Sequence, residues 1–182
     1  LSLAHVLGYT GKINAGELER LAGSGYLALD YLGKAGLEYS WEKELRGHNG
    51  KRNIEVDALG REKKVVSEQA AVDGYNLKLA LDLPLQQKAE EVTNRWLGEL
   101  SLRKASVIAI DPRNGEVRAL LSLPAYDSNL FAKGISQTDY DIFINDKDHP
   151  LLNRAISGEY PSGSVIKPVI ALAALEEKVI ND

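Results

Sequence analysis

Ser164 and Lys167 are the residues whose types and spacing most directly suggest chemistry. They stand three positions apart in the stretch 160–168 (YPSGSVIKP). Residues three apart share one face of a helix, so the hydroxyl and the amine come within hydrogen-bond reach. A serine hydroxyl is a poor nucleophile until a base takes its proton, and a desolvated lysine amine can be that base. The pair therefore predicts a serine nucleophile with a lysine general base.

The spacing alone is not specific, because the chain repeats it at Ser40 and Lys43 and again at Ser101 and Lys104. Both of these copies lie in polar stretches, which is typical of solvent-facing segments. The sequence around Ser164 is different, and it is this context that separates the three copies.

An apolar run at 169–175 (VIALAAL) follows Lys167 and is apolar nearly all round. This pattern predicts a helix that is buried on most sides. Proline breaks a helix interior but is tolerated in the first turn, so Pro168 requires the helix to start near Ser164. The hydroxyl then lies at a helix N-terminus, whose partial positive charge stabilises an oxyanion and disfavours a charged lysine.

Composition sets broad limits on the function. The chain has 182 residues, 44% of them apolar and 26% charged, which is ordinary for a globular protein of one domain or somewhat more. A net charge of −4 without a basic cluster argues against nucleic acid as a partner. No cysteine is present, so there is no disulfide framework and no thiolate metal site. No run reaches the length of a membrane span.

Metal and cofactor sites are not expected. His5, His48 and His149 lack the spacing of metal ligands and are interpreted as surface or loop residues. Four acidic residues resemble a calcium loop, but the glycine and the closing glutamate of an EF-hand are missing, so a solvated loop is predicted. They are Asp139, Asp141, Asp146 and Asp148.

The pattern along the chain predicts an α+β fold in two units, 1–74 and 75–182. The first unit is mostly β and the second is an antiparallel sheet packed by helices. In the first unit we expect helices at 14–21 and 36–45, and a hairpin of 54–57 and 63–66 with one face in water. In the second unit we expect a half-buried strand through 77–81, an amphipathic helix at 85–100, and a hairpin of 106–110 and 117–121. A long connection at 124–161 then leads to a helix at 164–175 that packs on the sheet and is exposed in part.

Several segments, in this order, resemble the class B penicillin-binding proteins, whose transpeptidase domain carries a Ser-x-x-Lys nucleophile motif. The match extends over nearly the whole chain and is nearest to the elongation-type branch, often called penicillin-binding protein 2. The segments are 5–11 (HVLGYTG), 33–38 (GKAGLE), 45–47 (LRG) with Gly50, 57–61 (DALGR), 82–86 (DLPLQ), 110–117 (IDPRNGEV), 122–127 (SLPAYD), 153–156 (NRAI) and 160–168.

The resemblance implies a pedestal, or dimerisation-type, module followed by the N-terminal part of a transpeptidase domain. It implies that Ser164 attacks the penultimate D-Ala carbonyl of a peptidoglycan stem peptide, that Lys167 accepts the proton, and that the Ser164 backbone N–H is one oxyanion donor. β-Lactams would trap the same acyl-enzyme. Two positions depart from the family pattern, since Ser162 replaces a second proline and Ile166 an aromatic residue. The chain stops before the family's Ser-x-Asn and Lys-Thr-Gly motifs, so an internal piece that is inactive alone is expected.

The resemblance also implies partners and a location. These are a glycan polymerase of the SEDS family, other elongation-machinery proteins, and the outer face of a bacterial cell membrane, with an anchor upstream of this stretch. One alternative is a non-catalytic scaffold that binds those partners through its pedestal. Another is a β-lactamase or β-lactam sensor, which shares Ser-x-x-Lys but lacks the segment at 33–38 and the hairpin at 111–117 in this form.

Overall fold

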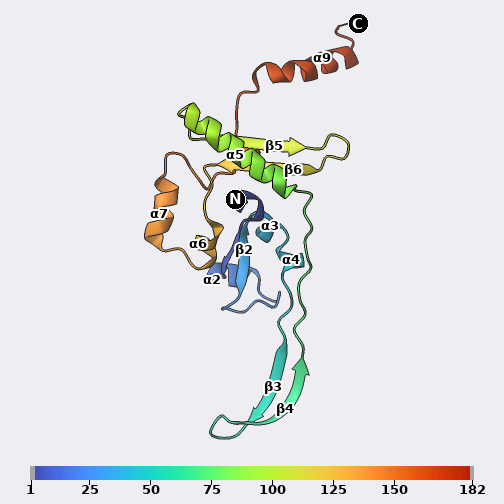
Figure 1. Cartoon of the computed structure of the whole chain (residues 1–182). Helices are drawn as coiled ribbons and strands as arrows, with labels where there is room; N and C mark the ends of the chain where they lie inside the picture. The colour runs from blue at the N-terminus through green and yellow to red at the C-terminus, as the bar shows by residue number, and fades with distance from the viewer. Residues whose placement is uncertain (1–2, 181–182) are drawn as a thin grey trace.

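A computed structural model describes residues 3–180 and confirms the α+β class (Figure 1). The N-terminal part is built from short elements around one antiparallel strand pair, β1 with β2. These elements are α1 (Ala4–Leu7), β1 (Tyr9–Lys12), α2 (Ala15–Arg20), β2 (Tyr31–Ala35), α3 (Gly36–Ser40) and α4 (Glu42–Leu45). The single helix predicted at 36–45 is thus two helices separated at Trp41.

Helix α2 begins where the sequence predicts it. The Asn14 side chain accepts a hydrogen bond from the Glu17 backbone N–H at 2.9 Å, and the Glu17 carboxylate accepts one from the Asn14 N–H at 2.8 Å. This reciprocal arrangement is a capping box, and it satisfies two backbone donors that a helix start leaves unpaired.

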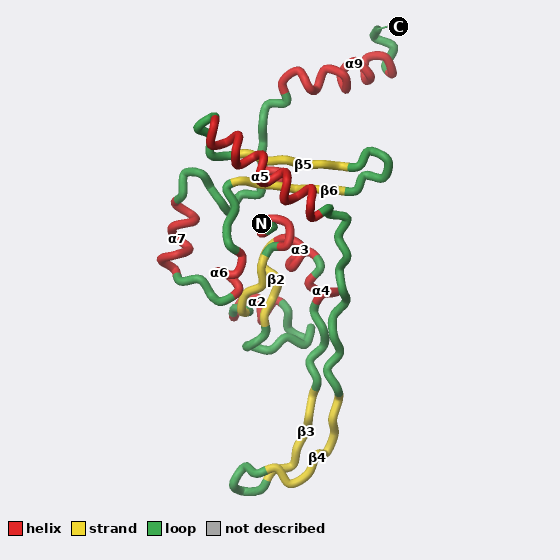
Figure 2. The backbone as a smooth tube through the Cα atoms, viewed as in Figure 1, coloured by secondary structure: helices red, strands yellow, loops and turns green. Residues whose placement is uncertain are grey.

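The next strands form a long hairpin that extends away from the body, as Figure 2 shows. Strand β3 (Lys51–Val56) pairs antiparallel with β4 (Glu62–Gln69). A sheet with one buried face was predicted, but all residues of both strands except Val65 are exposed. The prediction of a buried face is wrong because no other described element covers either side of this two-stranded ribbon.

From Tyr75 to Asp82 the chain runs back to the body without forming the predicted strand. Leu77, Leu79 and Leu81 are half-buried, but the backbone of this segment forms no ladder of hydrogen bonds with another strand. Instead, the Arg118 side chain donates to the Ala80 carbonyl oxygen at 3.1 Å, and the Asp82 N–H donates to the Arg118 carbonyl oxygen at 2.8 Å. Single contacts with the neighbouring strand therefore replace a strand pairing.

Helix α5 (Leu83–Glu99) packs across the predicted second hairpin, which consists of β5 (Ala105–Ile110) and β6 (Val117–Leu123) (Figure 1). The helix is capped by Asp82, whose side chain accepts from the Leu85 N–H at 3.0 Å. Strand β6 provides much of the core, because Ala119, Leu121 and Leu123 are buried. Burial of this strand requires cover from several elements, and α1 and α8 (Arg154–Ser157) also contact it.

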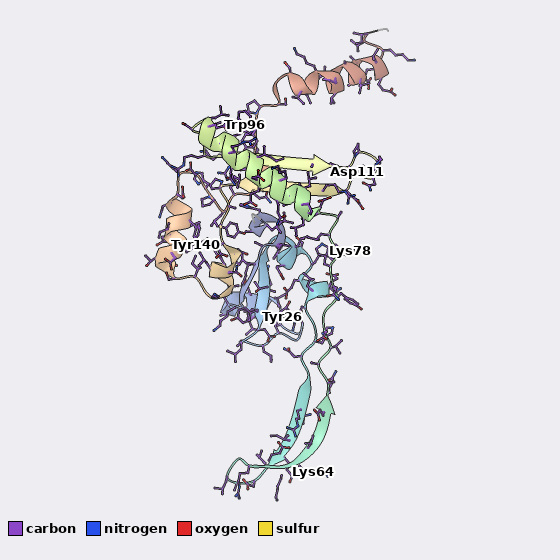
Figure 3. The ribbon with its side chains drawn as sticks, viewed as in Figure 1. Tyr26, Lys64, Lys78, Trp96, Asp111 and Tyr140 are labelled. Atoms are coloured by element: carbon purple, nitrogen blue, oxygen red, sulfur yellow. The ribbon has the colours of Figure 1, made fainter. Side chains whose placement is uncertain are left out.

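The buried face of α5 is centred on a polar residue, Gln86, which has no exposed surface. Its side-chain amide donates to the Leu120 carbonyl oxygen and its side-chain oxygen accepts from the Leu120 N–H, both at 2.8 Å. Gln86 thus pairs with β6 as a neighbouring strand would. The predicted apolar stripe lies beside this face, so Leu85, Trp96 and Leu100 are exposed; Figure 3 labels Trp96 near the C-terminal end of α5.

The segment predicted as one long connection, 124–161, contains three helices. They are α6 (Ser128–Ala132), α7 (Gln137–Asn145) and α8. Phe131 of α6 is buried and lies 4.5 Å from Tyr9 of β1, centroid to centroid. The prediction missed these helices because they are short and have no strong apolar period of their own. Helices α6 and α7 are held through the ring contacts of Phe131 with Tyr9 and Phe143, and α8 through its contacts with β5 and β6.

Candidate active site

Ser164 and Lys167 lie in one continuous helical segment. Ser164 is in a 3-10 turn, η1 (Gly163–Ile166), and Lys167 opens helix α9 (Lys167–Glu176). The Lys167 backbone N–H donates to the Ser164 carbonyl oxygen, the i to i+3 bond that defines this turn. Side chains three apart eclipse one another in a 3-10 helix, so the hydroxyl and the amine project from the same side. The predicted pairing of the two positions on one face is therefore present in the backbone.

The beginning of the segment is set by glycine and proline. Gly163 has φ +56°, in the left-handed region that favours glycine. Pro168 is within the first two positions of α9, where a missing N–H costs nothing. The α-helix starts at Lys167, three residues later than predicted, so Ser164 lies one turn before the α-helix rather than at its first residue.

The expected burial of this segment is not found. Every residue from 161 to 180 is exposed except Ala174, which is half-buried, and the one extensive contact of α9 with another described element is with η1. Figure 1 shows α9 projecting beyond the body, so the expected packing on the sheet is also absent. An all-round apolar helix needs cover on several sides, and one two-stranded hairpin already occupied by α5 does not supply it.

Lys167 is likewise exposed rather than desolvated, and within residues 3–180 no hydrogen bond joins its side chain to Ser164. The backbone therefore sets positions 164 and 167 on one side of a turn, and both side chains are exposed. The structure does not show the desolvation that would make the lysine amine a base.

The other two Ser-x-x-Lys copies form no comparable pair. The Ser40 hydroxyl donates to the Gly36 carbonyl oxygen of its own helix at 3.0 Å, and α3 ends before Lys43. Ser101 has φ +53°, and Lys104 lies 3.8 Å from the Asp148 carboxylate. Neither serine is on a continuous helix with its lysine, as the context in the sequence indicates.

The acidic residues of the 139–148 stretch have separate partners and do not converge on one site. Asp139 accepts from the Ser136 hydroxyl at 2.7 Å, and Asp146 accepts from the Asp148 N–H at 2.8 Å. Asp148 was predicted to be solvated, but it is 4% exposed and forms an ion pair with Arg103. Within the part of the chain that the structure describes, no group of three or more His, Asp or Glu residues is placed to hold a metal ion.

His5 is buried, contrary to its interpretation as a surface residue. Its Nε2 lies 2.8 Å from the Pro150 carbonyl oxygen, and its backbone carbonyl accepts from the Asn153 side-chain amide at 3.2 Å. The His5 ring also meets the Tyr126 ring edge-on, with centroids 5.1 Å apart. Helix α1 therefore docks directly on the loop that precedes α8 and the Ser164 segment, a contact between residues 145 positions apart that no local pattern signals.

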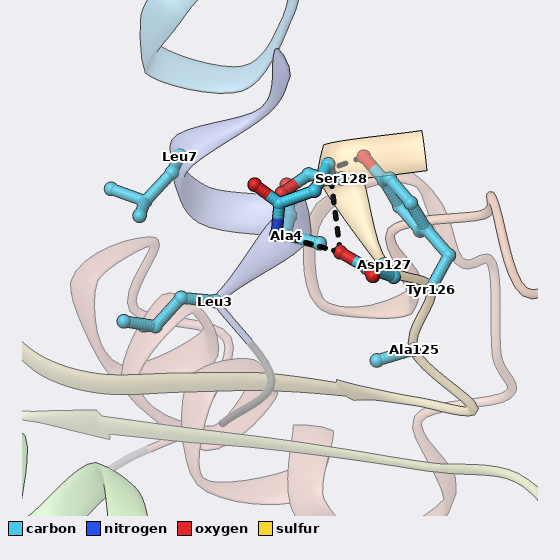
Figure 4. A pocket seen from close by; sticks show the side chains of 8 residues that line it. Leu3, Ala4, Leu7, Ala125, Tyr126, Asp127 and Ser128 are labelled. Carbon is cyan, nitrogen blue, oxygen red and sulfur yellow. Dashed lines mark hydrogen bonds between the residues drawn. The ribbon is translucent and has the colours of Figure 1, made fainter. Parts of the chain in front are cut away.

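Tyr126 also contacts α1. Its hydroxyl donates to the Ala4 carbonyl oxygen at 3.3 Å, and a pocket of about 550 Å³ lies beside it between α1 and residues 125–129 (Figure 4). Burial, with a smaller contribution from Tyr9, raises the pKa of Tyr126 to about 12. The phenol therefore stays neutral and remains a hydrogen-bond donor across the physiological range.

We expect the docking of α1 to weaken in mild acid. Burial lowers the pKa of His5 below its usual 6.5; the hydrogen bond to the Pro150 carbonyl opposes this in part, and the nearby Arg154 charge adds to the lowering. As the pH falls through 6.5 the unfolded chain takes up a proton before the folded one, so stability is present above that pH and is lost below it. The melting temperature should fall between pH 7.5 and 5.5, and His5→Gln should reduce that fall. An unchanged pH dependence in His5→Gln would show that another group is responsible.

Comparison with known proteins places the chain in a family. The family model "Penicillin-binding Protein dimerisation domain" matches residues 1–79, and "Penicillin binding protein transpeptidase domain" matches residues 105–182. The chain belongs to the penicillin-binding proteins that join these two domains, which confirms the resemblance drawn from the sequence. None of the described helices is long and apolar enough to cross a membrane.

Among its curated relatives is the peptidoglycan D,D-transpeptidase MrdA of Escherichia coli (strain K12). It is 42% identical over 184 residues, which cover 99% of this chain and 28% of the relative. The chain therefore spans somewhat more than a quarter of the length of that relative.

Two solved structures have the same fold. A complex between penicillin-binding protein PBP2 and MreC from Helicobacter pylori matches with a TM-score of 0.83 at 30% identity, over 99% of this chain and 32% of that chain. A structure titled "Structural coordination of polymerization and crosslinking by a peptidoglycan synthase complex" matches with a TM-score of 0.79 at 33% identity, over 98% and 32%.

Proposed function

We propose that the protein to which this chain belongs is a peptidoglycan D,D-transpeptidase, with Ser164 as nucleophile and Lys167 as general base. The observation that carries the proposal is the 3-10 turn that sets both side chains on one side of a helical segment. It is supported by the transpeptidase-domain match over 105–182 and by the activity in the name of the relative MrdA.

In the proposed reaction the Ser164 Oγ forms a bond to the carbonyl carbon of the penultimate D-Ala while its proton passes to the Lys167 amine. The Ser164 backbone N–H donates to the oxyanion. The C–N bond then breaks, and the terminal D-Ala leaves with a proton returned to its nitrogen. An amine of a neighbouring stem peptide attacks the acyl-serine, which forms the cross-link and restores the hydroxyl.

The base role requires Lys167 to lose its exposure to water. A charged ammonium cannot accept a proton, and desolvation lowers a lysine pKa by disfavouring the charged form. We propose that, in the complete protein, further transpeptidase-domain residues cover α9 and this lysine. The apolar surface of α9 supports this, since Val169, Ile170 and Leu172 are each more than half exposed.

The test is an intact mass measurement of the complete protein after benzylpenicillin. A β-lactam ring opens on the nucleophile without a leaving group, so the expected product is a stable adduct of one drug mass, which peptide mapping locates at Ser164. An adduct that is rapidly lost would identify a β-lactamase instead. An adduct at another residue, or none, would refute the proposal.

We further propose that the protein acts at the outer face of a bacterial cell membrane with elongation-machinery partners, a SEDS-family glycan polymerase among them, and that its two units meet near Gly74. The MreC complex and the synthase complex formed by similar proteins support the partners. Co-purification of the complete protein with a membrane-embedded polymerase tests this. If the protein bound such partners but formed no penicillin adduct, the scaffold alternative would hold.

A further inference from the structure

Arg154 is a buried cation without a carboxylate partner in the described part of the chain. It is 5% exposed, and its guanidinium donates to three backbone carbonyl oxygens. These belong to Asp148, to His149 at 3.1 Å and to Leu152 at 3.4 Å. A buried charge is costly unless it is fully hydrogen-bonded, so the loop 148–152 is folded around this guanidinium.

The same residue is attached to the core strand β6. The Arg154 backbone N–H donates to the Ser122 Oγ at 3.0 Å, and the Ser122 hydroxyl donates to the Leu152 carbonyl oxygen at 3.0 Å. Ser122 is 1% exposed and lies in the strand that α5 also covers. Arg154 is thereby held from two sides, by the loop before it and by the strand beneath it.

The chain then reaches the nucleophile in ten residues, with one further close contact. A Cβ on Gly158 would lie 2.7 Å from the Arg154 carbonyl oxygen and 2.4 Å from the Tyr160 ring. Gly158 therefore lies between the Arg154 carbonyl oxygen and the Tyr160 ring at the end of α8, and only a residue without a side chain fits there. Between α8 and α9 the chain leaves the body (Figure 1), so α8 is the last element packed on the body before Ser164.

We infer that Arg154 is a positioning residue for the Ser164 nucleophile. It fixes the point and direction at which the nucleophile segment leaves the hairpin, and it touches neither substrate nor the reacting atoms. The inference rests on the proposed function of Ser164. Arginine suits the role because its planar fork offers five donors in fixed directions, which serve several carbonyls at once, whereas a lysine ammonium is a point charge.

The experiment measures penicillin acylation of the complete protein as a function of drug concentration, which separates the half-saturating concentration from the limiting rate. Arg154→Lys keeps the charge but loses the fork. A displacement of about 1 Å at a reacting atom costs on the order of 10²-fold in rate. We expect a limiting acylation rate about 10- to 100-fold lower, with a half-saturating concentration within about threefold of the unsubstituted protein.

Gln86→Met is the matched control for a merely structural effect. Gln86 is buried and hydrogen-bonded to the same strand, β6, but on the side of α5. Its substitution should lower the melting temperature and leave the limiting acylation rate unchanged. An equal loss of rate in Gln86→Met would overturn the inference, because destabilisation alone would then explain it.

Two further outcomes separate the role of Arg154 from the proposed function of Ser164. Unchanged acylation in Arg154→Lys would overturn the inference while leaving the proposed function intact, whereas the absence of any adduct on the unsubstituted protein would remove both. If Arg154→Lys does not fold, Ser122→Ala replaces it, because it deletes only the hydroxyl that ties Arg154 to β6. A lower limiting rate in that variant supports the inference, and an unchanged one refutes it.

Discussion

Ser164→Ala in the complete protein is expected to abolish the benzylpenicillin adduct and to reduce cross-linking to a trace. Removing the nucleophile of a serine enzyme eliminates the covalent intermediate and lowers turnover on the order of 10⁶-fold. The substitution exchanges one exposed hydroxyl for hydrogen in a short turn, so the melting temperature should not change. Intact mass spectrometry and a stem-peptide cross-linking assay measure the two effects.

The chain supplies its own controls for this experiment. Ser40→Ala and Ser101→Ala remove the serines of the other two Ser-x-x-Lys copies, which are also exposed. Both variants should form the adduct at the normal rate, because neither serine shares a helical turn with its lysine. Loss of the adduct in either variant, or its survival in Ser164→Ala, would assign the nucleophile to another residue.

Lys167→Ala is expected to slow acylation about 10²- to 10⁴-fold, the usual contribution of a positioned general base. The drug should still bind reversibly, since the substitution removes the proton acceptor and leaves the Ser164 nucleophile in place. The measurement is the limiting acylation rate in rapid-mixing experiments, with the half-saturating concentration determined alongside. A loss of affinity with an unchanged limiting rate would instead make Lys167 a binding residue.

Lys43→Ala is the appropriate control for lost charge, because Lys43 follows the Ser40 copy of the motif and has no ion pair in the described residues. Its acylation rate should equal that of the unsubstituted protein. Partial recovery of Lys167→Ala by a small added primary amine would further identify the missing group as a base.

Several elements could be predicted from sequence because their signals are local. Asn14 and Glu17 cap α2 through contacts three residues apart. The turn of the β5–β6 hairpin follows from Asp111, whose side chain accepts from the Arg113 N–H, and from Gly115 at φ +76°. In such cases the partners are neighbours in the chain, so composition and spacing contain the necessary information.

The wrong predictions concern burial, and they share one cause: whether a residue is buried depends on partners that lie far away in the sequence. Gln86 is buried because it pairs with Leu120, 34 residues away, and Arg154 because it meets Ser122, 32 residues away. A polar residue normally predicts exposure, and only a backbone partner brought by the fold reverses this. The apolar run of α9 led to the opposite error, since an apolar residue is buried only where something covers it.

The sequence by itself predicts Ser164 and Lys167 as a pair, because residues three apart on one helical turn share a side. It also determined the α+β class and the family, through short motifs in a fixed order. Only the tertiary structure decided where that turn is attached: to a loop folded around Arg154, tied to β6 through Ser122 and contacted by His5 from the start of the chain. These contacts join residues that lie far apart in sequence, and hydrogen bonds between them exist only once the chain has folded.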